Sequence, residues 1–530
     1  MQANSSQPAP HPSADNWRRF LLPSAADLVF LGVLFSLSCG ALVSRLLNDA
    51  GIGWHIRNGE LMLQSHAITR TDPFSSTMSG QPWFAWEWLY DLLIAGIHHW
   101  MGLNGVVFLT ALVIAATFAL TLRVVLARGG NLPLSIVLLA FSLGASAIHL
   151  FARPHVFSWL LAVAWFAALD CCETSAELAK NRSLFWLPAL ILLWVNVHGG
   201  FLTAFVLLGI FLASGFLEYL AGHDRSALVP WLKTLASITL LSLLATLANP
   251  YGYKLHEHIY RYVTNRFLMN HIEEFRSPDF HGMAAQCFVV LLLIAIVALA
   301  VSREKPRVSQ VLVMLFAAGS GLYSARNLPV SSLLLTLTVT PLLSRTIADA
   351  KNRPELAGWV RRLLSRWDSF ASRMGHMEGS LRGHLWPLAG AVFGLLICLH
   401  GGKLGASQIM DAHFPAKRFP VQAVDLLAQR SSHEPVFCPD YWGGYLIYRL
   451  YPQTKVVVDD RHDLYGEQFL KQYLKAIQVE SGWEQVLVEW RVNVILVPSE
   501  SALANVLRES LHWRVIYKDK VGALYQRSSS

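Results

Sequence analysis

The chain has 530 residues, of which 54% are hydrophobic and only 15% are charged, and its mean hydropathy is +0.40. This balance excludes a soluble globular protein of this length and predicts a polytopic membrane protein. The formal net charge of +8 comes from basic residues dispersed among short loops, so it does not indicate nucleic-acid binding. The six cysteines show no zinc-site spacing.

The first apolar run, residues 26–43, is not followed by a small-residue cleavage site, so we expect an uncleaved span after a cytoplasmic tail at 1–25. Later apolar runs give about eleven candidate spans in all. They lie near residues 26–43, 104–122, 132–149, 156–169, 184–197, 200–219, 234–249, 283–301, 308–323, 328–343 and 385–402. The prediction is an α-helical transmembrane domain over 26–403.

Basic residues indicate the topology. If the spans alternate from an N-terminus inside, the loops with Arg123 and Arg128, Lys180 and Arg182, Arg225 and Lys233, and residues 303–307 all fall on the inner side. So does the basic linker at 344–384, which we expect to contact anionic lipid. The alternation requires residues 86–101, with Glu87 and Asp91, to form a surface-lying amphipathic helix. An odd number of spans then places residues 404–530 outside.

Unusual polar residues collect on the outer side of this topology. Ionisable groups at a membrane boundary are costly unless they face a cavity or serve chemistry. Carboxylates can take a proton or position a metal, and arginine can bind phosphate with two hydrogen bonds, so this face suits a lipid-phosphate substrate. The residues are Asp49 and His55 in outer loop 44–103, Arg153 and His155 in the next, His198 and Arg326 in short turns, and Glu274 and Asp279 in outer loop 249–282.

Several of the neighbouring residues have a structural interpretation. Asp72 precedes a proline, which is typical of a turn or cap. Trp83, Trp86 and Trp88 are typical of an interfacial aromatic belt. For His198, beside two glycines, close packing and a role in the site both stay open.

The polar C-terminal region, 404–530, predicts a small α/β domain. Short apolar runs at 436–438, 455–458 and 492–497 read as buried parallel strands separated by helical patterns, and 513–526 reads as a hairpin. The segment from Asp459 to Asp463 follows the second strand, where open α/β sheets place ligands. It either binds a ligand or metal, or forms a capped loop in which Arg461 pairs with a neighbouring acid.

Several motifs together resemble the GT-C superfamily of polyprenyl-phosphate-dependent membrane glycosyltransferases, and within it a bacterial family grouped with these enzymes. The superfamily includes oligosaccharyltransferases, protein mannosyltransferases and aminoarabinose transferases. The match covers nearly the whole chain. It rests on Gly53-Trp-His-Ile-Arg-Asn-Gly-Glu60, Thr71-Asp-Pro-Phe-Ser75, Trp86-Glu-Trp-Leu89, Arg153-Pro-His155, Asn196-Val-His-Gly-Gly200, Asn249-Pro-Tyr-Gly252 and Tyr441-Trp-Gly-Gly-Tyr-Leu446.

The resemblance implies roles for individual residues. Asp49 would be the catalytic base or acceptor-orienting group, with His55 nearby. The second outer loop lacks the acid that superfamily members often have, so Glu274 or Asp279 would supply a second carboxylate, acting through a divalent cation such as Mg²⁺ or Mn²⁺. Arg153 and Arg326 would bind the carrier phosphate. His155 and His198 would contact substrate, as would Asp440 and Trp442, whose segment is similar to the Trp-Trp-Asp-Tyr-Gly motif of oligosaccharyltransferases.

The expected function is therefore transfer of a sugar from a polyprenyl-phosphate-linked donor to an unidentified acceptor, at the outer face of a bacterial inner membrane. Membrane lipid and the carrier are the expected partners, and nucleic acid is not. The alternative is a non-catalytic scaffold or a subunit of a surface-glycan or lipid assembly complex. A transporter is disfavoured because the sequence shows no inverted repeat.

Overall fold

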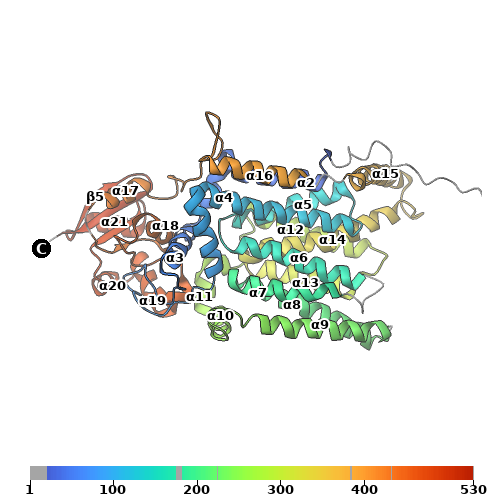
Figure 1. The fold of residues 1–530 in the computed structure, drawn as a ribbon, viewed down its shortest axis with the longest axis horizontal. Coiled ribbons are helices and arrows are strands. Elements are labelled where there is room, and N and C mark those ends of the chain that lie inside the picture. Colours follow the sequence, from blue (N-terminus) through green and yellow to red (C-terminus); the bar gives the residue numbers. More distant parts are fainter. Residues whose placement is uncertain (1–20, 175–181, 224, 382–384, 431–432, 529–530) are drawn as a thin grey trace, which may run out of the picture.

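A computed structural model describes residues 21–174, 182–223, 225–381, 385–430 and 433–528. It shows a bundle of long helices with a smaller α/β domain at one end (Figure 1). Most of the expected N-terminal tail, and the basic residues Arg18, Arg19, Lys180 and Arg382, lie outside the described residues. We call the end of the bundle that carries the α/β domain the domain end.

The bundle contains, within the described residues, seven helices long and apolar enough to cross a membrane. Counting each of two sharply bent helix pairs as one span gives up to nine. Its helices are α2 (Ala25–Ser38), α4 (Trp88–Ala127), α5 (Leu132–Ser146), α6 (His155–Thr174), α7 (Leu187–Val197), α8 (Leu202–Leu220), α9 (Arg225–Ala245), α12 (Met283–Val301), α13 (Val308–Tyr323), α14 (Leu328–Ala350) and α16 (Leu385–Leu399). The polytopic helical fold is confirmed, and the count of eleven spans stays a prediction.

Packing inside the bundle follows the sequence composition. Four tryptophans, Trp159, Trp165, Trp194 and Trp231, are almost fully buried between helices. Leucine and isoleucine side chains such as Leu240 and Ile296 are exposed on the outer helix faces, which suits contact with lipid chains. Two-sided apolarity of this kind is typical of membrane helices.

The segment expected to lie on the membrane surface, 86–101, forms the first part of α4. Gly102, with φ of +57°, breaks this part from the rest of the helix. The segment packs closely on α3 (Gly51–Ser65), because a Cβ at Gly59 would come within 2.0 Å of the Asp91 carbonyl oxygen. Glu87 and Asp91 are buried, which corrects the expectation that they mark a water-facing helix.

Outer loop 249–282 folds into α10 (Lys254–Thr264), α11 (Arg266–His271) and the turn η5 (Glu273–Phe275). Together with α3 these short helices lie at the domain end, between the bundle and the α/β domain (Figure 1). Turns η1 (Gly40–Leu47), η2 (Ala147–His149), η3 (Arg182–Trp186), η4 (Gly199–Phe201) and η6 (Ala325–Asn327) join the bundle helices.

The basic linker forms α15 (Gly358–Ser380), which lies at the opposite end of the bundle from the α/β domain and runs across the bundle axis (Figure 1). Trp359, Leu363 and Met377 are exposed along it. Such a helix is typical of a membrane-surface segment.

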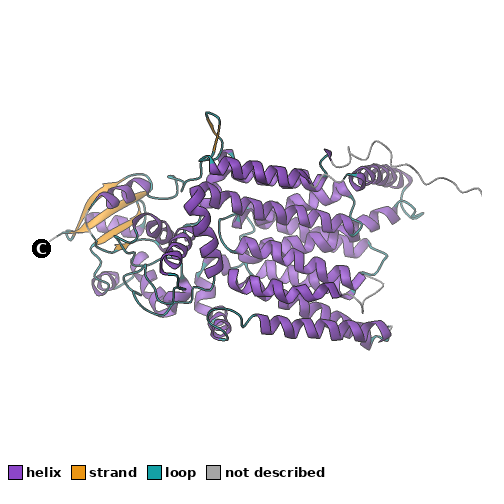
Figure 2. Ribbon diagram, viewed as in Figure 1, coloured by secondary structure: helices purple, strands orange, loops and turns teal. Residues whose placement is uncertain are grey.

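The α/β domain has a four-stranded sheet in the order β3-β4-β6-β5. Figure 2 shows the larger strands in the α/β domain, away from the helical bundle. Its strands are β3 (Val436–Phe437), β4 (Val494–Pro498), β5 (Trp513–Lys518) and β6 (Gly522–Arg527), and its helices are α17 (Val421–Gln429), α18 (Asp440–Leu450), α19 (His462–Ile477), α20 (Trp483–Glu489) and α21 (Ala502–Glu509). β3 and β4 are parallel, and the closing hairpin is antiparallel, as expected. A short hairpin, β1 (Lys403–Leu404) with β2 (Ser407–Gln408), precedes the domain. The expected strand at 455–458 makes only single bridges at Val456.

The first outer loop and the α/β domain form a continuous interface. Ser75 of the loop bridges to Val456 in parallel, so the loop adds to the edge of the domain's sheet. α3 and α18 approach through glycine: a Cβ at Gly444 would lie 2.3 Å from the Ala50 carbonyl oxygen, and one at Gly53 would lie 2.1 Å from the Gly444 carbonyl oxygen. The α/β domain and the first outer loop therefore pack together as one structure at the domain end of the bundle.

Candidate functional site

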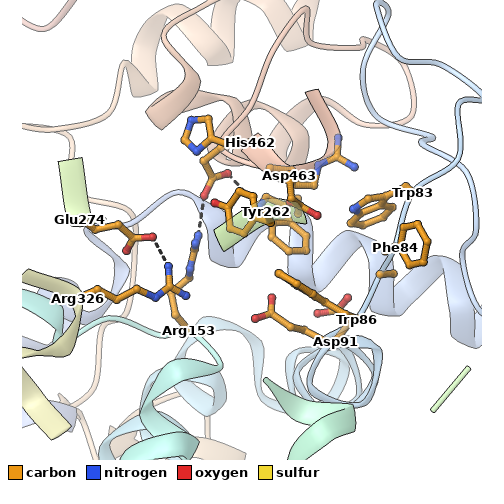
Figure 3. Close-up of a pocket in the computed structure, with 15 residues that line it drawn as sticks. Trp83, Phe84, Trp86, Asp91, Arg153, Tyr262, Glu274, Arg326, His462 and Asp463 are labelled. Atoms are coloured by element: carbon orange, nitrogen blue, oxygen red, sulfur yellow. Dashed lines mark hydrogen bonds and ion pairs between the residues drawn. The ribbon is translucent and has the colours of Figure 1, made fainter. Parts of the chain in front are cut away.

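A pocket of about 570 Å³, including its open mouth, lies where the bundle, outer loop 249–282 and the α/β domain meet. One side carries the charged residues Arg153, Glu274 and Arg326, and the other carries aromatic rings (Figure 3). The full lining is Trp54, Trp83, Phe84, Ala85, Trp86, Glu87, Asp91, Arg153, Tyr262, Glu274, Arg326, Asp460, Arg461, His462 and Asp463.

Glu87 lies between two histidines in this lining. Its Oε2 is 3.7 Å from His55 Nε2, and its Oε1 is 3.7 Å from His198 Nε2. Burial raises the pKa of Glu87 to about 8, although Arg153 and Arg326 oppose the shift. A carboxyl group whose pKa lies near neutrality in a cleft can exchange a proton with a substrate.

Both histidines are held through their Nδ1 atoms. His55 Nδ1 lies 2.5 Å from Asp91 Oδ1, and His55 Nε2 has no hydrogen-bond partner among the described residues. Asn58 Nδ2 donates to the other Asp91 oxygen at 2.6 Å. His198 Nδ1 accepts from the Gly200 amide at 3.0 Å. Glu87 therefore has an imidazole ring on each side, with His55 Nε2 and His198 Nε2 as the facing atoms.

Arg153 is held by two carboxylates from distant parts of the chain. Its Nη1 donates to Asp49 Oδ1 at 3.0 Å and to Asp460 Oδ2 at 2.6 Å. Asp49 Oδ1 also accepts from the Gly51 amide at 2.8 Å, at the start of α3. Burial raises the pKa of Asp460 to about 6, with Asp49 adding to the shift and Arg153 opposing it.

Arg326 and Glu274 form the second charged pair in the pocket. Arg326 Nη1 donates to Glu274 Oε1, and Arg326 Nη2 lies 3.3 Å from His198 Nε2. Burial alone would raise the pKa of Glu274, but the nearby charges, of which Arg326 is the strongest, together outweigh burial and lower the pKa to about 2. Glu274 is therefore an anion that fixes Arg326 at the pocket wall.

The segment Asp459 to Asp463 of the α/β domain forms the roof of the pocket. Arg461 is buried and pairs with Asp72 at 2.8 Å and Asp459 at 2.7 Å, and its guanidinium lies 4.5 Å from the ring centre of Trp83. This matches the capped-loop interpretation for Arg461. Asp460, His462 and Asp463 nevertheless line the pocket, so the segment also contributes to the candidate site.

Comparisons with known proteins agree on the fold. No protein-family model and no curated protein matches the chain. Among solved structures, ArnT from Cupriavidus metallidurans in the apo state is 12% identical, with 94% of this chain and 96% of that chain covered and a TM-score of 0.51. The archaeal oligosaccharyltransferase AglB from Archaeoglobus fulgidus, in complex with an inhibitory peptide and a dolichol-phosphate, is 12% identical, with 95% and 74% covered and a TM-score of 0.50. Both belong to the GT-C superfamily. The chain has the GT-C fold.

The GT-C fold brings several predicted residues together. Arg153, Arg326 and Glu274 line the pocket. His55 and His198 do not line the pocket but lie next to Glu87, which does. Asp49 does not line it either, and contacts the pocket residue Arg153.

Other predicted residues lie elsewhere. Asp279 is exposed and accepts from the amide of His281 in its own loop. Trp442 is only 2% exposed in the core of the α/β domain, where its indole donates to the Arg418 carbonyl, so we correct its expected contact with an acceptor. Asp440 lies behind the pocket and pairs with His462 at 2.8 Å. His155, at the start of α6, donates from Nε2 to the His149 carbonyl oxygen of η2 at 2.8 Å.

Three kinds of pocket residue could not be recognised from the sequence. Glu87 and Asp91 were assigned to a surface helix. Trp83 and Trp86 were assigned to an aromatic belt, yet both line the pocket, and Trp86 packs edge-on against Tyr262. Tyr262 carried no signal. The one usable clue was the placement of Glu87 between two tryptophans, which is unusual for a residue that faces water.

The carboxylates in this region do not fit a divalent cation. The described residues contain no group of three or more His, Cys, Asp or Glu side chains arranged to hold a metal ion. The acids that come closest are each engaged: Asp49 and Asp460 with Arg153, Glu274 with Arg326, and Asp91 with His55 and Asn58. The expected Mg²⁺ or Mn²⁺ therefore has no ready ligand set, and no chemical step is derived through it.

Proposed function

We propose that the protein transfers a sugar from a polyprenyl-phosphate-linked donor to an acceptor bound at the pocket. The GT-C fold supports this class of reaction, because AglB, which shares the fold, is an oligosaccharyltransferase whose structure holds a dolichol-phosphate. The pocket adds the required chemical groups. It has two arginines for a phosphate and aromatic rings beside carboxyl groups for a sugar.

The observation that carries the proposal is the position of Glu87. It is a buried carboxyl group with a pKa of about 8, and it lines the same pocket as Arg153 and Arg326. A base beside two fixed guanidinium groups is the arrangement that a transfer from a phosphate ester needs, because charge leaves with the phosphate.

The proposed reaction has one bond formed and one broken. The ionised Glu87 takes the proton of the acceptor while the acceptor atom bonds to the anomeric carbon of the sugar. The bond between that carbon and the phosphate oxygen breaks, and the polyprenyl phosphate leaves as an anion held by Arg153 and Arg326. The proton on Glu87 then returns to solvent, with His55 Nε2 as the neighbouring acceptor.

Asp49 has a supporting role in this account. Its Oδ1 accepts from both the Gly51 amide and Arg153, and the side chain does not line the pocket. We therefore assign it to positioning Arg153, in place of the catalytic role expected from the sequence. The α/β domain end would face the outside of a bacterial inner membrane, as the positive-inside rule predicts.

The test uses purified full-length protein, a donor with a radiolabelled sugar on undecaprenyl phosphate, and host membranes as the source of acceptor. Wild type is expected to release undecaprenyl phosphate and to transfer label to an acceptor, and Glu87→Gln is expected to do neither. Glu257→Gln is the matched control, because Glu257 is an exposed residue of α10 outside the pocket. Wild-type protein that binds the donor without turnover would support the scaffold alternative.

A further inference from the structure

We propose that the guanidinium of Arg153, held between Asp49 and Asp460, is a built-in cation that binds the carrier phosphate in place of a divalent metal. Carrier binding would then need no metal ion. The inference rests on the proposed function for the choice of ligand, a polyprenyl monophosphate. It goes beyond that function by assigning the source of the positive charge.

The first support is the convergence of two carboxylates on one nitrogen atom. Asp49 Oδ1 and Asp460 Oδ2 both accept from Arg153 Nη1, at 3.0 and 2.6 Å. Asp49 precedes α3 in the first outer loop, and Asp460 belongs to the α/β domain, so the guanidinium joins the two parts of the site. Trp54 Nε1 fixes the other Asp460 oxygen at 3.0 Å.

The second support is the space beside Gly51, which the Arg153 guanidinium fills. A Cβ at Gly51 would lie 1.5 Å from Arg153 Nη1 and 2.6 Å from Asp460 Oδ2. The missing side chain of Gly51 is therefore the space that Nη1 occupies. Any residue other than glycine would displace the guanidinium from its two carboxylates.

The third support is the part of Arg153 that stays available. Arg153 lines the pocket, and its Nε and Nη2 donate no hydrogen bond to the described part of the chain. Two N–H groups on one edge of a guanidinium match two oxygens of a phosphate. Asp49 and Asp460 thus hold Nη1, and they leave Nε and Nη2 for a phosphate.

The charge balance also favours phosphate binding. Asp460, with a pKa of about 6, can take up a proton when a phosphate brings negative charge close to it. Asp49 then balances Arg153, and Glu274 balances Arg326, which leaves both guanidinium groups in place to hydrogen-bond the phosphate.

The experiment measures binding rather than turnover. Full-length protein in nanodiscs is titrated with undecaprenyl phosphate, once with EDTA and once with MnCl₂. Equal affinity is expected in the two conditions. Arg153→Gln is expected to weaken binding about tenfold or more, the loss typical of a charged hydrogen bond. Gly51→Ala should give a similar loss with every charged group present, and Gly96→Ala, where a Cβ meets open space, should give none.

Paramagnetic resonance of Mn²⁺ supplies a readout that does not depend on the lipid. Wild-type protein is expected to leave the signal of free Mn²⁺ unchanged. Because this measurement uses the wild-type protein, it tests the inference even if the Arg153→Gln variant fails to fold. Two results would overturn the inference but leave the proposed transfer possible. One is binding of undecaprenyl phosphate that requires Mn²⁺. The other is stoichiometric binding of Mn²⁺ to the wild type that is lost in the Asp49→Asn variant. Metal-free binding through Arg153 without any turnover supports the inference and contradicts the proposed transfer. No binding in either condition overturns the inference.

Discussion

Glu87 Oε2 and His55 Nε2 lie 3.7 Å apart, and the histidine nitrogen has no hydrogen-bond partner among the described residues. Burial lowers the pKa of His55 well below its ordinary value, with Arg153 contributing, so the ring is neutral. Asp91 fixes the orientation of the ring through His55 Nδ1. A neutral imidazole beside a carboxyl group of raised pKa forms a short path for a proton out of the pocket.

The first prediction concerns pH. Glu87 accepts a proton only when ionised, and its pKa is about 8, so the active form is present above about pH 8 and is lost as the pH falls. The transfer rate at saturating donor should fall about tenfold for each pH unit below this value. Initial rates between pH 6 and 9 check this, and a flat profile would rule out Glu87 as the base.

The second prediction separates activity from stability. Glu87 has an ordinary pKa of 4.5 and a folded pKa of about 8, so the unfolded chain releases this proton first. The stability from this group is therefore complete below pH 4.5 and is lost as the pH rises through 8. Glutamine cannot ionise, so Glu87→Gln at pH 8 should have a melting temperature equal to or above that of wild type.

Thermal unfolding of the two proteins at pH 5 and pH 8 measures this difference. The variant should gain relative to wild type as the pH rises. A variant that is destabilised equally at both pH values would indicate that Glu87 is a packing residue, and its loss of activity would then say little about chemistry.

The third prediction concerns the attachment of the α/β domain. Arg461→Gln leaves Asp72 and Asp459 buried without their partner, and removal of one member of a buried ion pair costs about 3–5 kcal/mol. Because the pair joins the first outer loop to the domain, the α/β domain should become sensitive to protease. Arg449→Gln is the control, since its pair with Asp425 is at the surface and contributes about 0–1 kcal/mol.

Limited proteolysis followed by mass spectrometry distinguishes the two variants. Cleavage between the bundle and the domain should appear in Arg461→Gln and not in Arg449→Gln. Equal resistance in both would mean that the glycine contact of α3 with α18 is sufficient to hold the domain.

The fourth prediction tests that glycine contact. Alanine at Gly444 would place a Cβ 2.3 Å from the Ala50 carbonyl oxygen, a backbone atom that cannot move away cheaply. Gly444→Ala should therefore lower the melting temperature by several degrees and weaken transfer, because α3 carries His55 into the site. Gly96→Ala should change neither quantity, and an unchanged Gly444→Ala protein would contradict the close packing.

Sequence patterns were sufficient for the membrane fold and for part of the pocket. Arg153, Arg326 and Glu274 could be predicted because charged residues next to apolar spans are rare and their loops fall on one side. The closing hairpin and the parallel pair of strands were also predictable, since apolar runs and turns are local signals.

The remaining features depend on contacts between distant segments. The Asp49–Arg153–Asp460 cluster joins three parts of the chain separated by more than 100 residues, and no local pattern indicates that they meet. Glu87 was misplaced because amphipathic character does not show whether the polar face meets water or a buried pocket. Trp442 resembled a recognition motif, but its indole fills the core of the α/β domain.

The most direct test of the central claim is the single-turnover rate of sugar transfer from labelled donor, measured for wild type and Glu87→Gln at saturating donor and pH 8. We predict a loss of about 10²–10⁴-fold in the rate, the range typical of a general base, with donor affinity unchanged and Glu257→Gln as active as wild type. A Glu87→Gln protein that transfers sugar at the wild-type rate would contradict the account.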